Sequence, residues 1–547
     1  MTDDRDQPTD GSKVTKSPPQ SVRSEVGVAR SEQGAAGASL FRAGAIVSTM
    51  TMLSRVLGLV RDMVIANYFG SSSAADTFFL AFRIPNLFRR LFGEGAFAQA
   101  FVPVLAEYRS RRSPADGSAF IGAVSGSLGI SLLAFTAFGV VAAPAFIHLF
   151  AAGYVYHDAA EKLALATDLL RITFPYLFFI AMTAFAGAVL NTWQRFAPPA
   201  FTPVLLNLCL IGAAVWLRDA FAVPVMALAW GVLAAGIFQF LFQLPFLARI
   251  GQLPVPRVDF RDAGVCRVLA LMLPALFAVS GGQINLLLDT ILASFLETGS
   301  IAWLYYSDRL LELPLALFGI AIATVILPNL SKDHAEADAD AFNAKLNWGL
   351  RLVLLLGVPA SAALIYLARP LIGSIFYQGE MTPRDVDQAG LALQAYGVGL
   401  VALMLVKVLA PGYFARQDMR TPVRYGLIAL VTNMVLNLIL VWPLAHAGLA
   451  LATGLAAFVN AGLLFVGLQR TCVFRALPGW PLLIARIVIA TTGMVAALSW
   501  MTPPLQVWLH LALLARLGLA MGVAVAGVGV YGLLLLVVGL RPSALRL

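Results

Sequence analysis

The chain has 547 residues, of which 59% are hydrophobic and only 12% are charged, and its mean hydropathy is +0.82. Soluble globular domains carry about 25% charged residues, so this composition excludes a soluble enzyme or binding domain. The net charge of +9 does not indicate a nucleic-acid partner, because the basic residues gather in loops between apolar runs, as in membrane proteins.

Residues 1–38 differ from the rest of the chain. They are rich in Asp, Ser, Pro, Gln, Lys and Arg and contain no apolar run that could form a core. We predict a disordered tail over this range.

From residue 41 onward, apolar runs of about 20 residues recur, which is the length that crosses a bilayer as a helix. A transmembrane β-barrel would show short segments of alternating hydrophobicity instead. We therefore predict an all-α polytopic membrane protein with about fourteen transmembrane helices. The predicted spans are 41–68, 76–107, 118–151, 162–190, 199–217, 222–248, 266–296, 300–330, 346–368, 387–414, 422–443, 447–469, 479–501 and 508–539.

The loops between these spans alternate in charge. Roughly eighteen basic residues fall in one set of loops and about four in the other. Positive loops face the cytoplasm, so we expect a multi-pass protein of the cytoplasmic membrane with both termini in the cytoplasm.

Two matching pairs of segments indicate an internal repeat. "AFAQAFVPVL" (96–105) resembles "AIATVILPNL" (321–330), and "WQRFAPP" (193–199) resembles "RQDMRTP" (416–422), which pairs Gln194 with Gln417. Both pairs are separated by about six helices, an even number, which predicts two parallel repeats with a substrate site between them. We predict an N-lobe over 39–250, a C-lobe over 264–470, and a C-terminal helix pair over 478–540.

Polar and charged residues inside the predicted spans indicate where a substrate site lies. A charge at the centre of a membrane helix costs about 2.5–3.5 kcal/mol, so these side chains are expected to face one another or a wet cavity. The first span contains Arg55, Arg61 and Asp62, the second contains Asp76, Arg83, Asn86, Arg89, Arg90 and Glu94, and the eighth contains Asp308, Arg309 and Glu312.

Helical spacing places Arg83, Asn86, Arg90 and Glu94 on one face, with Arg89 about 100° away. For one of Arg89 and Arg90, snorkelling to the interface is an equal alternative. Arginines outnumber acids on the first two spans, and guanidinium groups bind phosphate in a bidentate manner, so we expect a cavity that holds a phosphate or pyrophosphate. Isolated charges such as Lys407 and Arg516 are interpreted as snorkelling side chains.

Three long strings resemble one known family. "SRVLGLVRDMVIANYFGSSSAADTFFLAFRIPNLFRRLFGEGAFAQAFVPVLAEY" (54–108), "YYSDRLLELPLALFGIAIATVILPNLSK" (305–332) and "LAPGYFARQDMRTPV" (409–423) resemble the MurJ/MviN family of bacterial lipid II flippases. The resemblance extends over about residues 40–540. It implies the fold of the MOP exporter superfamily, with two six-helix lobes and two further helices that form a groove for the lipid tail.

The resemblance also implies roles for particular residues. Arg55, Arg61, Arg89 and Arg309 match the family's cavity arginines, and Asp76 matches an important acidic position. The candidates of second rank are Asn86, Glu94, Asp308 and Glu312. Arg83 and Arg90 are further substrate-binding candidates from their helical spacing. Asp289 matches a sodium ligand found in some members of the family.

The expected function is transport of lipid II, undecaprenyl-pyrophosphoryl-MurNAc-pentapeptide-GlcNAc, to the outer leaflet for peptidoglycan synthesis. The expected partners are lipid II, membrane lipids and proteins of cell-wall synthesis, and no cofactor is expected. Coupling to sodium, to protons or to the membrane potential alone stays open. The alternatives are a related MOP exporter of drugs or of another lipid-linked oligosaccharide, a polyprenyl-phosphate transferase, and a non-transporting scaffold. The dispersed acids, most of them beside arginines, argue against an enzyme.

Overall fold

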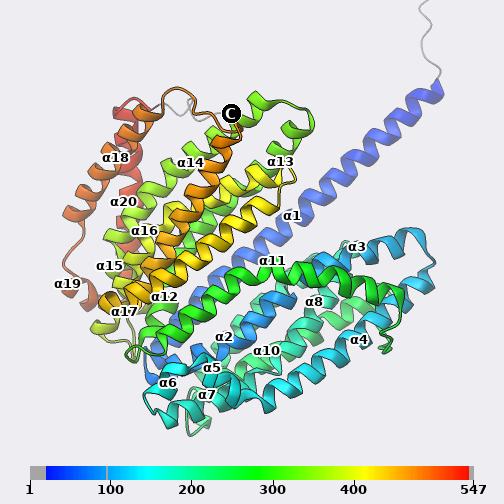
Figure 1. Cartoon of the computed structure of the whole chain (residues 1–547), viewed down its shortest axis with the longest axis horizontal. Coiled ribbons are helices and arrows are strands. Elements are labelled where there is room, and N and C mark those ends of the chain that lie inside the picture. Colours follow the sequence, from blue (N-terminus) through cyan, green and yellow to red (C-terminus); the bar gives the residue numbers. More distant parts are fainter. Residues whose placement is uncertain (1–19, 94–95, 541–547) are drawn as a thin grey trace, which may run out of the picture.

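The computed structural model describes residues 20–93 and 96–540, and these residues form helices and connecting loops with no β-strand among them. Figure 1 shows two groups of helices that splay apart from one end of the molecule. In chain order, α1–α10 belong to the first group and α11–α20 to the second, and α1 and α11 run between the remaining helices of the two groups. This all-helical arrangement agrees with the predicted fold class.

The first group follows the predicted N-lobe. Its helices are α1 (Gln20–Phe69), α2 (Ser73–Gly93), α3 (Ala96–Arg111), α4 (Pro114–Val141), α5 (Ala143–Phe150), α6 (Ala152–Tyr156), α7 (Ala160–Thr173), α8 (Tyr176–Thr192), α9 (Ala197–Gly212) and α10 (Met226–Arg249). A π-helical turn, η1 (Ala213–Leu217), and a 3-10 turn, η2 (Arg218–Ala220), extend α9.

The second group contains the predicted C-lobe and the C-terminal pair. Its helices are α11 (Ala263–Ala293), α12 (Ser300–Pro314), the π-helical η3 (Leu315–Ile320), α13 (Ala321–Ala335), α14 (Ala339–Tyr366), α15 (Ala368–Phe376), α16 (Pro383–Phe414), α17 (Arg420–Arg470), α18 (Trp480–Met501), α19 (Leu505–His510) and α20 (Leu513–Val537).

Ten helical stretches within the described residues are long and apolar enough to cross a membrane. One of them, α17, holds two predicted spans, because Ala445 (φ 47°, ψ −132°) breaks the helix and the chain turns back there. The amide of Asn433 then donates to the Thr453 hydroxyl across the two halves. The remaining predicted spans lie in α1, in α2 with α3, and in α11. Every predicted span therefore falls on a helical stretch.

Two of the predicted ranges include residues outside the described part of the chain. α1 begins at Gln20, within the range 1–38 for which a disordered tail is predicted, and residues 1–19 of that range lie outside the described residues. The span predicted over 76–107 is covered by α2 and α3, which lie on either side of residues 94–95, outside the described residues.

The backbone supports the internal repeat. Gln194, at the end of α8, and Gln417, at the end of α16, both adopt φ of 60°, although non-glycine residues rarely do so. The residue after each glutamine closes the same turn, with Arg195 N–H donating to Leu190 O and Asp418 N–H donating to Tyr413 O. Corresponding helices of the two lobes therefore end in the same way. In this second turn, hydrogen bonds from Thr421 hold the pKa of Asp418 below its usual range.

Successive spans run antiparallel, so their turns collect on two faces. The basic face contains the turns from α3 to α4, α8 to α9, α10 to α11, α13 to α14 and α16 to α17, which carry most of the loop arginines. The opposite face contains the turns from α1 to α2, α6 to α7, α11 to α12 and α15 to α16.

The C-terminal helices are fixed to the C-lobe by polar contacts of buried side chains. Tyr531 donates to Leu355 O at 2.8 Å, and Trp508 donates to the Ser374 hydroxyl at 2.7 Å. Arg516 is 5% exposed and donates to Gly373 O, so its interpretation as a snorkelling side chain is wrong. A buried carbonyl satisfies this arginine where the sequence alone suggests no partner.

Candidate functional site

A polar cluster joins the two lobes at Asp62. The carboxylate accepts hydrogen bonds from Arg61 Nε at 2.9 Å and from the Tyr305 hydroxyl at 2.8 Å, and it forms an ion pair with Arg309 Nε at 3.0 Å. Asp62 and Arg61 lie on α1, whereas Tyr305 and Arg309 lie on α12. We call Arg61, Asp62, Asn207, Tyr305 and Arg309 the Asp62 cluster. It is the point at which arginines of the two lobes converge.

The two arginines of the Asp62 cluster differ in what they can still bind. Arg61 is 7% exposed and also donates to Asn207 Oδ1 and to the Tyr305 hydroxyl, so most of its five N–H groups are occupied. The Arg309 side chain is 33% exposed and uses its other nitrogens on Glu312 at 3.1 Å and Tyr305 at 3.3 Å. Arg309 therefore keeps N–H groups that a ligand can reach, whereas Arg61 mainly fixes Asp62.

A second group, the Asp308 cluster, lies beside the first and consists of Arg83, Arg90, Asp289 and Asp308. Arg83 and Arg90 of α2 both lie close enough to Asp308 of α12 for electrostatic attraction. Arg83 also attracts Asp289 of α11 and donates to the Thr290 hydroxyl. Arg83 and Arg90, which helical spacing places on one face of α2, thus both lie near Asp308.

The remaining arginine candidates flank these clusters. Arg55 lies seven residues before Asp62, hence on the same face of α1 and about 10 Å nearer the basic face, and it is exposed. Arg89 Nε donates to Asn86 Oδ1 at 2.8 Å. Glu94, another predicted site residue, lies outside the described residues.

The charge balance of the site differs from the sequence-based expectation. An excess of arginine on the first two spans predicts a positive field, but Asp289 and Asp308 approach these arginines from α11 and α12. Within the two clusters, acids and arginines are therefore closely matched. The excess positive charge comes from Arg55, on the basic-face side of the Asp62 cluster, and from Arg89, next to Arg90 on α2. An anion bound here would meet arginines that are already held in place by carboxylates.

Asp76 lies at the opposite face rather than in either arginine cluster. It is 3% exposed, and its two carboxylate oxygens accept the backbone N–H groups of Gly299 at 2.6 Å and Ala302 at 2.8 Å. These groups form the N-terminus of α12, where unpaired N–H groups and the helix dipole favour a negative charge. Asp76 of the N-lobe thus caps a helix of the C-lobe and holds the two lobes together.

Backbone contacts close the same face around two glycines. Gly70 (φ 56°) and Gly379 (φ 53°) lie in loops of different lobes, and Glu380 N–H donates to Asn67 O at 3.0 Å between them. A Cβ at Gly379 would lie 2.0 Å from Asn67 O, and one at Gly70 would lie 2.6 Å from Glu380 O. Both the left-handed backbone and the close approach therefore require glycine.

Asp289 also belongs to a chain of amides in the C-lobe. Asn437 Nδ2 donates to Asp289 Oδ1 at 2.6 Å and to Asn433 Oδ1 at 2.8 Å, and Asn433 reaches Thr453. The Oδ1 atom of Asn437 is buried without a hydrogen-bond donor. These residues provide carboxylate, amide and hydroxyl oxygens, which are the ligands that hard cations prefer.

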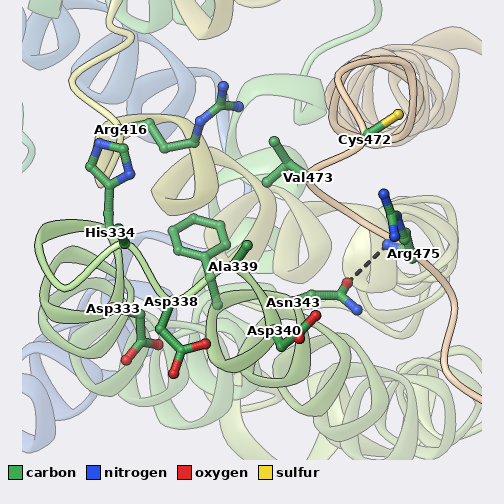
Figure 2. Close-up of a pocket in the computed structure, with 12 residues that line it drawn as sticks. Asp333, His334, Asp338, Ala339, Asp340, Asn343, Arg416, Cys472, Val473 and Arg475 are labelled. Carbon is green, nitrogen blue, oxygen red and sulfur yellow. Dashed lines mark hydrogen bonds between the residues drawn. The ribbon is translucent and has the colours of Figure 1, made fainter.

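A separate pocket of about 360 Å³ lies on the basic face of the C-lobe (Figure 2). The turn between α13 and α14 and the ends of α16 and α17 form its walls, and Asn343 Oδ1 accepts the Arg475 N–H at 2.8 Å. Asp333 in its wall pairs with Lys345 at 2.6 Å. The pocket contains no residue of either arginine cluster, so its contacts tie loops together rather than extend the site.

Comparison with known proteins identifies the family. The model of the lipid II flippase MurJ family matches residues 65–537. The chain belongs to this family. The match includes the arginines of α2 and α12 and both cluster-forming acids of the C-lobe. Membership in a transporter family agrees with the predicted transporter function.

Curated members of the MurJ family are similar over nearly their whole length. The probable lipid II flippase MurJ of Vibrio cholerae serotype O1 is 49% identical over 512 residues, which cover 93% of this chain and 98% of that protein. The lipid II flippase MurJ of Burkholderia cenocepacia is 42% identical over 466 residues, covering 84% and 90% of the two chains.

Solved structures agree with this family assignment. A lipid II flippase MurJ in an inward closed conformation superimposes with a TM-score of 0.75 at 27% identity, covering 90% of this chain and 98% of that one. An inward-facing multidrug resistance MATE transporter of the MOP superfamily has a TM-score of 0.63 at 14% identity, covering 78% and 98% of the two chains, and shares the fold alone.

Sequence analysis missed two residues that organise the site. Tyr305 contacts Asp62 and both arginines of the Asp62 cluster, and its ring stacks on Phe79 at 4.1 Å between centroids. Asn207 fixes Arg61 and donates to Ser54 O. Tyr305 lies four residues before Arg309, so helical spacing could have indicated it. Nothing in the local sequence around Asn207 points to α1.

Proposed function

We propose that this chain moves lipid II from the inner to the outer leaflet of the cytoplasmic membrane by alternating access. Membership in the lipid II flippase MurJ family and the names of relatives that align over nearly their full length support this function. The positive loops support a cytoplasmic location for the basic face and for both termini. The contacts of Asp76, Gly70 and Gly379 then correspond to a state closed toward the outside.

In this proposal, the diphosphate of the substrate binds at the arginines that keep reachable N–H groups. Arg309 is the main proposed diphosphate-binding residue, because its side chain is one-third exposed while its Nε is paired with Asp62. Arg55 and Arg89, with Arg83 and Arg90, supply further guanidinium groups, whose fork geometry suits phosphate oxygens. Arg61 is a positioning residue, since its contacts fix Asp62, Tyr305 and thereby Arg309.

The driving force follows from the charges involved. An inside-negative membrane potential favours outward movement of an anion by about 2.3 kcal/mol per charge per 100 mV. Sodium is a candidate coupling ion, and Asp289 with the oxygens of Asn433, Asn437 and Thr453 would hold it in the C-lobe. If sodium drives the cycle, Asp289→Asn lowers transport and abolishes its dependence on sodium. Equal transport with and without sodium in the wild-type protein would leave the potential as the driving force.

Complementation tests the arginine assignment. In a bacterium depleted of its own flippase, the wild-type chain restores growth and outer-leaflet lipid II, whereas Arg309→Ala and Arg61→Ala do not, at equal protein levels in the membrane. Lys332→Ala is the matched control, because its side chain is 69% exposed on the basic face. Full rescue by both arginine variants contradicts the proposed site, and failure of the wild-type chain to restore outer-leaflet lipid II contradicts the function.

A further inference from the structure

A second cavity lies inside the C-lobe. It has a volume of about 570 Å³, it is open to the surface on one side, and α11, η3, α16 and both halves of α17 line it. Its walls are mainly aliphatic, but five polar side chains interrupt them, namely Asn285, Lys407, Asn433, Thr453 and Asn460. An apolar wall with a few converging polar groups is typical of a ligand site.

Lys407 is the only cation in the described wall of this cavity. It lies seven residues before the end of α16, about 10 Å from the basic face, and its side chain is exposed. No hydrogen bond or ion pair involves Lys407 within the described residues. Snorkelling, the sequence-based interpretation, explains an exposed lysine but not its place in the wall of a cavity. An ammonium at this depth favours an anionic ligand.

The asparagines supply the complementary groups. Asn285 and Asn460 each carry an Oδ1 atom that is buried and accepts no hydrogen bond in the described structure. A buried oxygen without a donor costs about 1–3 kcal/mol, so these amides gain by turning toward a ligand that supplies N–H groups. Asn433 links the cavity through Asn437 to Asp289, and hence to Arg83 in the Asp308 cluster.

We propose that this cavity binds the peptide arm of the lipid-linked head group, with Lys407 pairing to a peptide carboxylate and the asparagine amides bonding peptide groups. The inference rests on the proposed function. The diphosphate is matched by the arginine clusters, because guanidinium groups bind it in a bidentate manner, whereas one ammonium serves a single carboxylate. Contacts from Asn433 through Asn437 and Asp289 connect the wall of this cavity to Arg83, so the proposed peptide subsite and the arginine clusters belong to one polar network.

The test compares two probes on the purified full-length protein in detergent. One probe is lipid II, and the other is lipid II from which an amidase has removed the peptide, so that both share the diphosphate, sugars and tail. Lys407→Gln weakens binding of lipid II about tenfold, as expected for a charge-assisted hydrogen bond, and leaves binding of the peptide-free probe unchanged. Lys407→Arg retains most of the affinity for lipid II.

Two controls separate the possible outcomes. Arg424→Gln removes a charge from the same lobe beside the cavity but outside its wall, and it leaves both affinities unchanged. Arg309→Ala weakens both probes, because both carry the diphosphate. Equal weakening of both probes by Lys407→Gln, or no weakening of either while its melting temperature matches the wild type, overturns the peptide subsite. If the wild-type protein binds neither probe, the proposed function fails, and the subsite fails with it.

Discussion

The cap that Asp76 places on α12 predicts a measurable shift between closed and open states. Its carboxylate accepts two backbone N–H groups across the lobes. Hydrogen bonds to charged groups contribute about 1.5–3 kcal/mol each. Asp76→Asn retains one acceptor and loses the charge that favours the helix N-terminus, so we expect a loss of about 2 kcal/mol of closed-state stability. That loss raises the ratio of open to closed molecules about thirtyfold.

Thiol labelling of the opposite face measures this shift. Ser71 is 8% exposed in the closed state and lies at the contact between lobes, where its hydroxyl meets Met381 Sδ. With the three native cysteines replaced by serine, Ser71→Cys is labelled by a membrane-impermeant maleimide only when this face opens. Asp76→Asn therefore raises the labelling rate by about thirtyfold.

A matched acid on the same face controls for charge. Asp219 lies in η2, and its side chain is 80% exposed, so Asp219→Asn leaves the labelling rate at Ser71→Cys unchanged. An unchanged rate in the Asp76→Asn protein, at a wild-type melting temperature, would refute the capping role of Asp76. A rate raised equally by both variants would show that charge at this surface, rather than the cap, controls access.

Three further predictions concern the contacts between lobes. Gly379→Ala places a Cβ against Asn67 O in a left-handed backbone, so it opens the face opposite the basic face and raises the labelling rate at Ser71→Cys. Gly462→Ala, whose Cβ meets no atom within 4 Å, leaves this rate unchanged. Tyr305→Phe removes the hydroxyl that both arginines of the Asp62 cluster contact, so lipid II binding weakens about three- to tenfold by titration, while a packing role alone would leave it unchanged. Asp62→Asn leaves Arg61 and Arg309 without their shared carboxylate. We expect a lower melting temperature, because a buried charge that loses its partner costs about 3–5 kcal/mol. An unchanged melting temperature would contradict the buried ion pair.

Much of the architecture was predictable because membrane spans are long, apolar and bounded by turn residues. The pairing of Gln194 with Gln417 illustrates how far sequence could go, since both residues adopt the same rare backbone conformation. The spacing of Arg83 and Arg90 places them on one face of α2, and both lie near enough to Asp308 for electrostatic attraction. Helical periodicity determines which residues on one helix share a face.

Sequence could not give the contacts between distant helices. The pairing of Asp62 with Arg309 joins residues far apart in the chain, and no local pattern contains that information. For the same reason, sequence analysis expected Asp308 to face other charged residues but could not say that Arg83 and Arg90 of α2 are the arginines near it. Asp76 was grouped with the substrate-binding candidates because it matches an acidic position of the resembled family, and the structure shows it capping α12 about 10 Å from Arg83 along α2.

The ion pair between Asp62 and Arg309 gives a physical reason for coupling between substrate and lobe movement. Because the two residues belong to different lobes, opening of the opposite face separates them unless the lobes rotate about this point. Asp62 would keep Arg61 and remain paired, whereas Arg309 would lose its buried carboxylate and keep only the exposed Glu312. In the proposed transport cycle, a diphosphate bound at Arg309 would replace the lost partner and offset the cost of separation, which for a buried ion pair is several kcal/mol. An empty site would have no such replacement, so the proposal predicts that substrate favours the outward movement and that the lobes otherwise stay closed on the outside.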